Sequence, residues 1–334
     1  MTIRELSSLE NYEDHQVKQA DNINTPAHQH TGTSRDQIIA EFDPNGQGFA
    51  GHLFGLPFTP ENASLVIMPV PWEVTVSYHS GTARGPQAIV EASSQVDLAV
   101  KDIPDAWKLG ISMLPFPHAM YQESVRLREW ASQHVVTSDK TNPPDLKKIN
   151  DACENLNLHI KSATEKLLKE GKMVALLGGD HSTPLGFLQT LSEEYEDYGI
   201  LQLDAHCDLR RAYQGFTYSH ASIMYNALKL PSVSKLVQAG IRDYCDEELE
   251  LIQHSGRRVE TFFDEDIKAQ LFEGKSWSIV CEQIIHALPQ NVYISFDIDG
   301  LNPKLCPNTG TPVPGGLEFE QATYLIKKLA TSGK

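Results

Sequence analysis

The sequence lacks the features that mark several large classes of protein. Its 334 residues contain no apolar run that approaches the roughly 20 residues of a membrane-spanning helix. Its 5 cysteines are an odd number, and they lie far apart without a CxxC pair. This usage argues against a disulfide framework and a thiolate zinc site, and it favours a reducing, cytoplasmic setting. The first residues mix charges and contain no apolar segment, so no secretory signal is expected.

Basic residues are also scarce. Lysine and arginine together number 28, against 44 aspartates and glutamates, so the net charge at pH 7 is −16. Such a charge repels phosphate backbones and anionic membrane surfaces, so neither nucleic acid nor a membrane is expected as a partner. The same excess of acid suits metal ions and small cationic molecules.

The pattern of apolar residues predicts one α/β domain over residues 61–334. Short, nearly continuous apolar runs alternate with segments of helical period, which is typical of parallel strands covered on both faces. The expected architecture is a three-layer α/β/α sandwich with a central, mostly parallel β-sheet. Residues 1–60 are polar and show no sustained period, so we expect an N-terminal extension that forms an arm or an oligomer contact. The expected strands are 64–70, 173–177, 199–203, 236–239 and 291–296, the expected helices are 87–96, 145–169, 184–196, 246–254 and 266–288, and 115–145 predicts no definite element.

Acidic and histidine side chains gather after three of the expected strands. The three segments are GGDHS at 178–182, DAHCD at 204–208 and DIDG at 297–300. Ligands of open parallel sheets bind beyond the carboxyl ends of the strands, so these segments are expected to meet at one edge. Each segment alone is a weak signal, but their coincidence at successive strand ends favours a metal site.

The spacing within these segments places carboxylates together. In extended chain, residues two apart project to the same side, so Asp204, His206 and Asp208 share one side, as do Asp297 and Asp299. Four carboxylates at one edge repel one another strongly unless cations neutralise them. The cluster therefore predicts bound divalent ions.

Together with His181, these side chains supply six ligands and no thiolate. This donor set fits Mn²⁺, with Ni²⁺, Fe²⁺, Co²⁺ or Zn²⁺ as alternatives. Two ions bridged by carboxylates would use all six ligands, and four carboxylates would balance their charge. Such a centre can receive a cationic substrate and supply hydroxide at neutral pH. Hydrolysis of a guanidinium compound fits this chemistry, although the spacing alone does not separate it from other metal-assisted hydrolyses.

These motifs resemble the ureohydrolase family, which contains arginases, agmatinases, guanidinobutyrases, formiminoglutamases and guanidine hydrolases. The similarity covers about residues 64–334, and DAHCDLR followed by YSHAS resembles the agmatinase branch more than the arginase branch. Further similar segments are GTARGPQAI at 81–89, YSHAS at 218–222, AGIR at 239–242 and TGTPVPGG at 309–316.

The resemblance implies roles for individual residues. His220 and Asp208 would be the catalytic residues, with His220 as the proton shuttle to the leaving amine, and Thr311 would line the guanidinium end of the pocket. The cofactors would be two divalent ions per subunit, Ni²⁺ or Mn²⁺, and the assembly a homohexamer or a trimer. The implied ligands are His181, Asp204, Asp208 and Asp297 for one ion and Asp204, His206, Asp297 and Asp299 for the other, with Asp204 and Asp297 bridging.

The substrate is the least constrained part of the prediction. Trp72 and Tyr78 lie in an expected loop at the mouth, where aromatic rings can stack on a planar cation. The long N-terminal extension resembles the guanidine-hydrolase branch, which favours guanidine, hydrolysed to urea and ammonia. Agmatine, which would give putrescine and urea, and guanidinobutyrate are the alternatives. The family also has an acidic residue that binds the guanidinium after the last glycine-rich segment, and here we expect it beyond Lys334.

Two other classes of function stay open from the sequence. One is a non-catalytic metal-binding homologue, against which the complete ligand set and His220 argue. The other is a deacetylase of similar architecture that uses a single zinc, against which the six ligands argue. Urea production and the number of ions per chain distinguish these alternatives.

Overall fold

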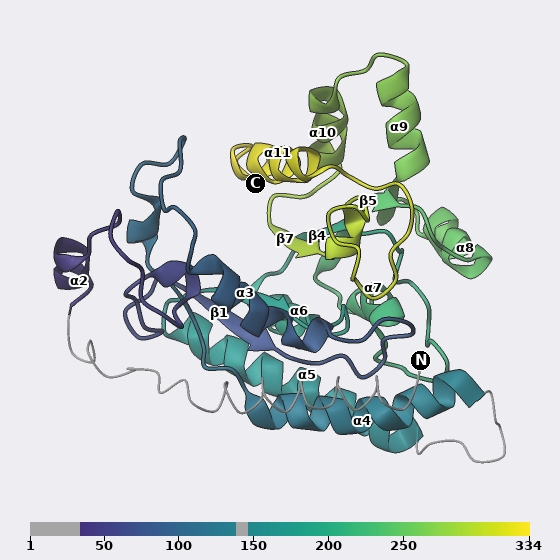
Figure 1. Ribbon diagram of the computed structural model, residues 1–334. Helices are drawn as coiled ribbons and strands as arrows, with labels where there is room; N and C mark the ends of the chain where they lie inside the picture. Colours follow the sequence, from purple (N-terminus) through teal and green to yellow (C-terminus); the bar gives the residue numbers. More distant parts are fainter. Residues whose placement is uncertain (1–33, 138–145) are drawn as a thin grey trace, which may run out of the picture. The chain divides into compact units, whose positions relative to one another are not determined.

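The computed structural model of this chain describes residues 34–137 and 146–334, shown in Figure 1. The first half of the expected N-terminal extension, residues 1–33, lies outside the described residues. The chain divides into two compact units. The described part of the first comprises 34–67 and Gln87–Leu114, and that of the second comprises Met68–Pro86 and 115–137 with 146–334.

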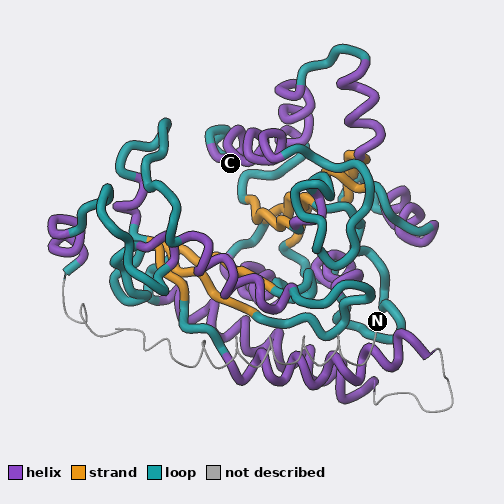
Figure 2. The backbone as a smooth tube through the Cα atoms, viewed as in Figure 1, coloured by secondary structure: helices purple, strands orange, loops and turns teal. Residues whose placement is uncertain are grey.

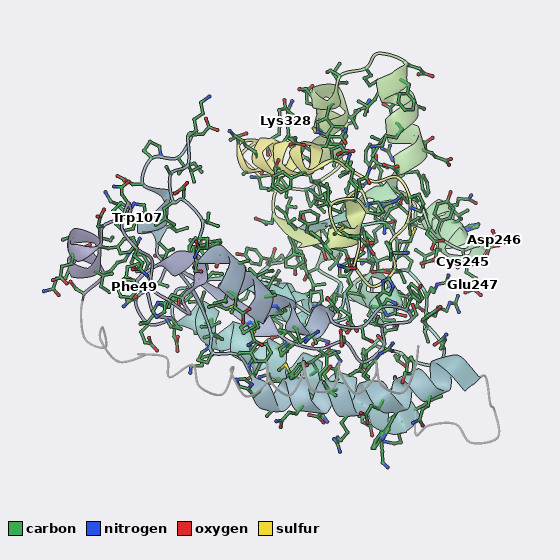
Figure 3. The ribbon with its side chains drawn as sticks, viewed as in Figure 1. Phe49, Trp107, Cys245, Asp246, Glu247 and Lys328 are labelled. Atoms are coloured by element: carbon green, nitrogen blue, oxygen red, sulfur yellow. The ribbon has the colours of Figure 1, made fainter. Side chains whose placement is uncertain are left out.

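The first unit contains all of the described part of the expected extension, residues 34–60. Ser34 caps the first helix by accepting a hydrogen bond from the Gln37 backbone, and Ile38 of that helix is buried. Trp107, labelled in Figure 3, is also buried and packs its ring 5.2 Å from that of Phe42. These contacts were not predicted, because a helix of 7 residues is too short to show a period. The elements are α2 (Arg35–Glu41), η1 (Leu53–Gly55), β2 (Ile111–Met113), η3 (Ala106–Leu109) and parts of β1 (Leu65–Val70) and α3 (Gly85–Ser93).

The second unit carries the larger part of the fold. Its helices and strands agree with the expected α/β alternation, and α5, β3, α6, β4, α8 and β7 lie close to their predicted bounds. Its elements are η2 (Thr82–Arg84), α4 (His118–Thr137), α5 (Leu146–Lys169), β3 (Met173–Gly178), α6 (Leu185–Glu194), β4 (Tyr198–Leu203), η4 (His220–Ser222), α7 (Ile223–Ala227), β5 (Val233–Ile241), α8 (Asp246–His254), β6 (Val259–Phe263), α9 (Asp264–Phe272), α10 (Trp277–His286), β7 (Val292–Phe296), η5 (Ile298–Gly300) and α11 (Phe319–Ala330).

The strands form two sheets. One has the order β2-β1-β3 and the other the order β6-β5-β4-β7. In the larger sheet β4 pairs in parallel with both β5 and β7, and β5 pairs in parallel with β6. The predicted parallel α/β class is thus confirmed, while the strands are divided between two sheets where the sequence predicted one.

Helices cover both faces of the larger sheet. Leu201 and Leu203 of β4 face a buried apolar cluster that includes residues of α9, α10 and α11. Ile200 of the same strand faces a second cluster, which includes residues of α6, α7 and α8. Alternate residues of one strand therefore serve opposite layers, as expected for a strand buried on both faces. This part of the second unit is a three-layer α/β/α sandwich.

The expected single helix over 266–288 is wrong, because the structure has two helices there. The chain turns at Gly274, whose φ of 90° lies in the left-handed region that glycine adopts without strain. The Ser276 side chain then accepts a hydrogen bond from the Ile279 backbone and starts α10. On α11, Lys328, labelled in Figure 3, lies 2.6 Å from a Glu282 carboxylate oxygen of α10.

No helix among the described residues combines the length and the apolar character needed to cross a membrane.

Candidate metal centre

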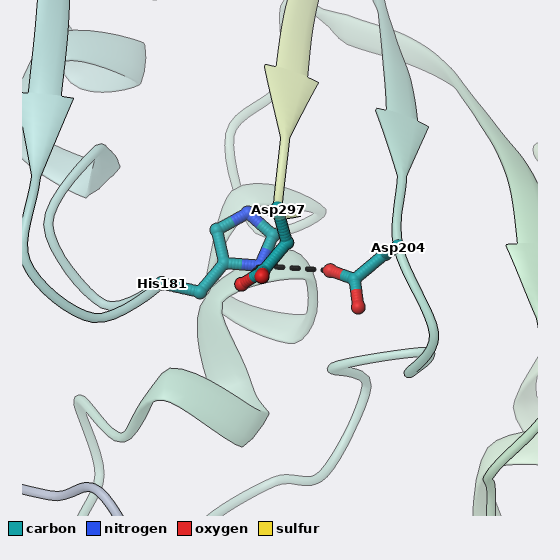
Figure 4. A group of neighbouring side chains, drawn as sticks. All are labelled: His181, Asp204 and Asp297. Carbon is teal, nitrogen blue, oxygen red and sulfur yellow. Dashed lines mark ion pairs between the residues drawn. The ribbon is translucent and has the colours of Figure 1, made fainter. Parts of the chain in front are cut away.

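The predicted ligands gather where three strands end. His181 follows β3, Asp204 follows β4 and Asp297 follows β7, and Figure 4 shows their side chains converging. His181 Nδ1 lies 2.9 Å from Asp204 Oδ2 and 3.5 Å from Asp297 Oδ2. These three side chains form one group that could hold a metal ion.

A second candidate group adjoins the first. His206 Nδ1 lies 3.1 Å from Asp299 Oδ2 and 3.6 Å from Asp204 Oδ1. Asp204 belongs to both groups, and it points one oxygen toward His181 and the other toward His206. The arrangement therefore has the geometry of two neighbouring cation sites that share one carboxylate. Asp297, expected to bridge as well, is placed in the first group.

Asp208 reaches the first group by a local change of backbone conformation. Its Oδ2 lies 2.8 Å from His181 Nδ1. Its φ is 55°, in the left-handed region, so the chain is not extended there and the predicted alternation through 204, 206 and 208 does not hold. The Asp208 carbonyl accepts hydrogen bonds from Met224 and Tyr225 at the start of α7, which fix the turn. This turn lies in the segment between β4 and η4, and Figure 2 shows how much of the backbone around the strands consists of such loops.

The carboxyl groups perturb one another because they are buried together. Burial and then the charge of Asp204 raise the pKa of Asp208 to about 7, and the same two causes raise the pKa of Asp297. Burial and the charge of Asp297 hold the pKa of Asp299 well above its usual value. Burial opposes ionisation of Asp204 too, but the close imidazoles of His181 and His206 outweigh it and lower the pKa of Asp204. Crowded carboxylates of this kind are stabilised by a cation.

The histidines present nitrogen atoms suited to a metal ion. His181 Nε2 lies 2.8 Å from Ser295 Oγ, so this ring nitrogen is engaged. His181 Nδ1 is buried and makes no hydrogen bond of good geometry within the described part of the chain, although it faces carboxylate oxygens. A buried ring nitrogen held by a hydrogen bond on its other side is the usual setting of a metal-binding histidine. The donor set therefore fits divalent cations.

Two partners of these histidines were missed in the sequence. Asp243 Oδ2 lies 3.6 Å from His206 Nε2, and the two residues face each other across an isolated parallel bridge. Ser295 holds His181 as described above. Asp243 directly follows the AGIR segment, and Ser295 lies two residues before Asp297 on β7. Only the register of the strands reveals that either side chain meets a histidine.

His220 lies at the start of η4, where two hydroxyl groups surround its ring. Its Nδ1 is 3.2 Å from Thr75 Oγ1 and 3.3 Å from Ser219 Oγ, and its backbone N–H donates to Thr75 Oγ1. Burial and then the nearby His206 and His181 lower the pKa of His220 to about 3. The imidazole of this histidine is therefore neutral at neutral pH.

We expect the Thr75 hydroxyl to orient the His220 ring. T75V keeps the shape of the side chain but removes the hydroxyl, whose hydrogen bond contributes about 0.5–1.5 kcal/mol. The turnover number should fall by about two- to tenfold. T75S retains a hydroxyl and should recover most of the loss. Steady-state kinetics at saturating metal measure both variants, and an unchanged kcat in T75V would contradict the role.

The residues expected to contact substrate have different environments. Trp72 is buried at 2% exposure, so its ring offers no face to a substrate, which does not fit the expected stacking role. Tyr78 is 70% exposed and its ring centroid lies 4.1 Å from that of His79. The backbone N–H of His79 donates to the carbonyl of Gly310, directly before Thr311, over 3.1 Å. The loop of Tyr78 and the loop of Thr311 are thus joined.

Arg242 ties the Thr311 loop to the metal-binding segment. Its Nη2 donates to the carbonyl of Asp299 over 2.7 Å and to that of Val313 over 3.0 Å. Its Nε donates to the Val313 carbonyl as well. The guanidinium therefore holds the backbone of one candidate ligand beside the segment that carries Thr311.

Fold and site together define a parallel α/β protein with two adjoining candidate cation sites at the carboxyl ends of its strands. A sequence model described as the arginase family matches residues 63–334. The chain belongs to the arginase family, and it is an agmatinase-like ureohydrolase, an enzyme that hydrolyses C–N bonds. The family resemblance inferred from the motifs is confirmed.

Named relatives and solved structures agree with this assignment. The chain is 34% identical to the N(1)-aminopropylagmatine ureohydrolase of Thermus thermophilus over 281 residues, 82% of this chain and 81% of that protein. It is 30% identical to the agmatinase of Salmonella dublin, with 80% of this chain and 76% of that protein covered. The structure of the agmatine ureohydrolase of Thermoplasma volcanium matches with a TM-score of 0.63 at 24% identity, over 88% of this chain and 85% of that one. This last likeness concerns the fold.

Proposed function

We propose that this enzyme hydrolyses a guanidine compound that bears an alkylamine tail, such as agmatine, and releases urea and the corresponding di- or polyamine. The names of the relatives carry this proposal, since relatives that are 30–34% identical in sequence include N(1)-aminopropylagmatine ureohydrolases and an agmatinase. The expected preference for free guanidine is not confirmed, and these relatives favour the agmatine alternative. Guanidinobutyrate, which carries an anionic tail, is less compatible with a chain of net charge −16.

Six side chains of the metal centre would hold two divalent ions, either Mn²⁺ or Ni²⁺. When bound, the ions would make water a nucleophile at neutral pH. The support for this assignment is the pair of adjoining ligand groups, the carboxylate they share and the buried Nδ1 of His181, which faces the Asp204 and Asp208 carboxylates. The proposed ligands are His181, Asp204, His206, Asp208, Asp297 and Asp299.

The remaining site residues would bind substrate and move protons. His220 would accept a proton from the attacking water and pass it to the departing amine, which must be protonated when its C–N bond breaks. Thr75 and Ser219 would hold the ring in place for this transfer. Thr311 would face the guanidinium, with its loop fixed by Arg242 and His79.

The setting of the enzyme is also part of the proposal. We expect a cytoplasmic enzyme that assembles as a homohexamer or a trimer, in which the N-terminal segment 1–60, whose residues 34–60 belong to the first compact unit, contributes to subunit contacts. The excess of acidic residues agrees with a small cationic substrate as its partner.

A substrate panel tests the proposal. Urea release should be measured from agmatine, N(1)-aminopropylagmatine, guanidine, guanidinobutyrate and arginine, each with Mn²⁺ and with Ni²⁺. We expect the highest kcat/KM from one of the two substrates with an amine tail. A higher kcat/KM for guanidine would restore the first expectation from the sequence, and no urea from any substrate would indicate a non-catalytic homologue.

A further inference from the structure

A row of polar side chains crosses the larger sheet just before the metal centre. In register, Ser295 of β7 lies beside Gln202 of β4, Gln202 beside Gln238 of β5, and Gln238 beside Thr261 of β6. Gln202 and Gln238 are 0% exposed and Ser295 is 4% exposed. The neighbours of Gln202 along β4 are leucines, and those of Gln238 along β5 are Val237 and Ala239, all packed into an apolar core cluster. Burying polar side chains within such a core is unfavourable unless hydrogen bonds compensate for the loss of water.

Three members of the row, Thr261, Gln238 and Gln202, form a continuous chain of hydrogen bonds that ends on Asp204. Gln202 Nε2 donates to Asp204 Oδ2 over 2.8 Å and to the carbonyl of His206 over 3.1 Å. Gln238 Nε2 donates to Gln202 Oε1 over 2.7 Å. Thr261 Oγ1 donates to Gln238 Oε1 over 2.7 Å. Three side chains from three adjacent strands are thus linked to the carboxylate shared by both ligand groups.

The carboxylate sets the direction of every bond in this chain. An ionised Asp204 only accepts hydrogen bonds, so Gln202 must turn its amide nitrogen toward it. The Gln202 oxygen then faces β5, and Gln238 must present its nitrogen there. The Gln238 oxygen faces β6, where the Thr261 hydroxyl donates to it. Reversing one amide would bring like atoms together at both of its ends.

The row also fixes the backbone that carries the ligands. Gln238 Nε2 donates to the carbonyl of Cys207 over 2.8 Å, and Gln202 donates to that of His206. Both carbonyls belong to the segment from Asp204 to Asp208. Burying an amide without partners is costly, but here each nitrogen and oxygen named has a partner.

We propose that Thr261, Gln238 and Gln202 are positioning residues that hold Asp204 and its loop in the conformation that binds two metal ions. This inference rests on the proposed function, because it requires the metal centre. It implies that the hydroxyl group of Thr261, on the edge strand β6, influences metal binding at the carboxyl ends of the strands. Partners that orient metal ligands typically contribute about 10- to 100-fold to metal affinity.

The experiment measures Mn²⁺ binding to full-length enzyme that has been freed of metal. Isothermal titration gives the dissociation constant and the stoichiometry without any need for activity. Q202M removes the bonds to Asp204 and should raise the dissociation constant by about 10- to 100-fold. T261V removes the far end of the chain and should raise it by about fivefold, the factor expected for one hydrogen bond, while T261S should bind as the wild type does.

A matched control separates positioning from general stability. Thr190 is also buried, and its hydroxyl donates to the backbone carbonyls of Lys161 and Gly186, away from the row. T190V should lower the Tm of the metal-free enzyme without changing Mn²⁺ affinity. T261V should change affinity even after its own Tm shift is taken into account.

The outcomes distinguish the inference from the proposed function. If T261V and Q202M bind Mn²⁺ as the wild type does, the row has only a structural role and the inference is wrong, while the metal centre stands. If Q202M does not fold, the comparison of T261V with T261S decides alone. If the wild type itself binds neither Mn²⁺ nor Ni²⁺, the proposed function fails and the inference fails with it.

Discussion

D204N should abolish hydrolysis and lower the metal content toward zero. Asparagine keeps the shape of the side chain but loses the charge, and Asp204 is the residue common to both candidate ligand groups. Losing it affects both ions at once, and the charge stabilisation that metal ions supply amounts to several kcal/mol. Because about 1.4 kcal/mol corresponds to a factor of ten, kcat/KM should fall by at least about 10³-fold. Metal analysis and urea release measure the two effects together.

D246N is the matched control for this substitution. Asp246 is an exposed acid in the first turn of α8, so the same exchange there removes a charge without touching the site. We expect two ions per chain and full activity. A D204N enzyme that retains both ions and near-normal activity would remove Asp204 from the centre, and with it the proposal of two sites that share a carboxylate.

H220A should separate metal binding from catalysis. The nearest described partners of the His220 ring are Thr75 and Ser219 hydroxyls, so both ions should stay bound. The rate should fall by about 10²–10⁴-fold, the contribution typical of a positioned acid or base. The loss should appear in kcat, because the histidine acts on the departing amine and not on the resting substrate.

The supporting measurements for H220A are metal content and chemical rescue. Two ions per chain with a depressed kcat, partly restored by added imidazole, would agree with a proton-transfer role. Loss of both ions in H220A would show that this histidine belongs to the metal centre instead. H159A, on the exposed face of α5, should match the wild type in both measurements.

The sequence predicted best those features of the fold and the site that depend on a single strand or a single motif. Apolar runs located β1, β3, β4 and β7, because parallel strands buried on both faces leave an unbroken apolar signal. The same runs fixed where the acidic segments would meet, so the convergence of His181, Asp204 and Asp297 followed from topology alone.

The remaining features depend on contacts between strands and on local backbone conformation. The left-handed conformation of Asp208 has no signature in the residue itself, since aspartate occupies several conformations. Gln202 and Gln238 lie within apolar strands, and their connection exists only in the register of β4 and β5. The break between α9 and α10 was overlooked because only four residues, 273–276, separate Phe272 from Trp277, so the two helices resemble one long helix in the sequence.

The thiol inside the metal-binding segment is shielded from reagents. Cys207 lies between His206 and Asp208, yet it is 0% exposed, and burial raises the pKa of its thiol above the usual value. A protonated, inaccessible sulfur reacts slowly with peroxide, because the thiolate is the reactive form. The proposed centre uses oxygen and nitrogen donors alone, so oxidative inactivation of this enzyme would have to begin at the metal ions or at a more exposed sulfur.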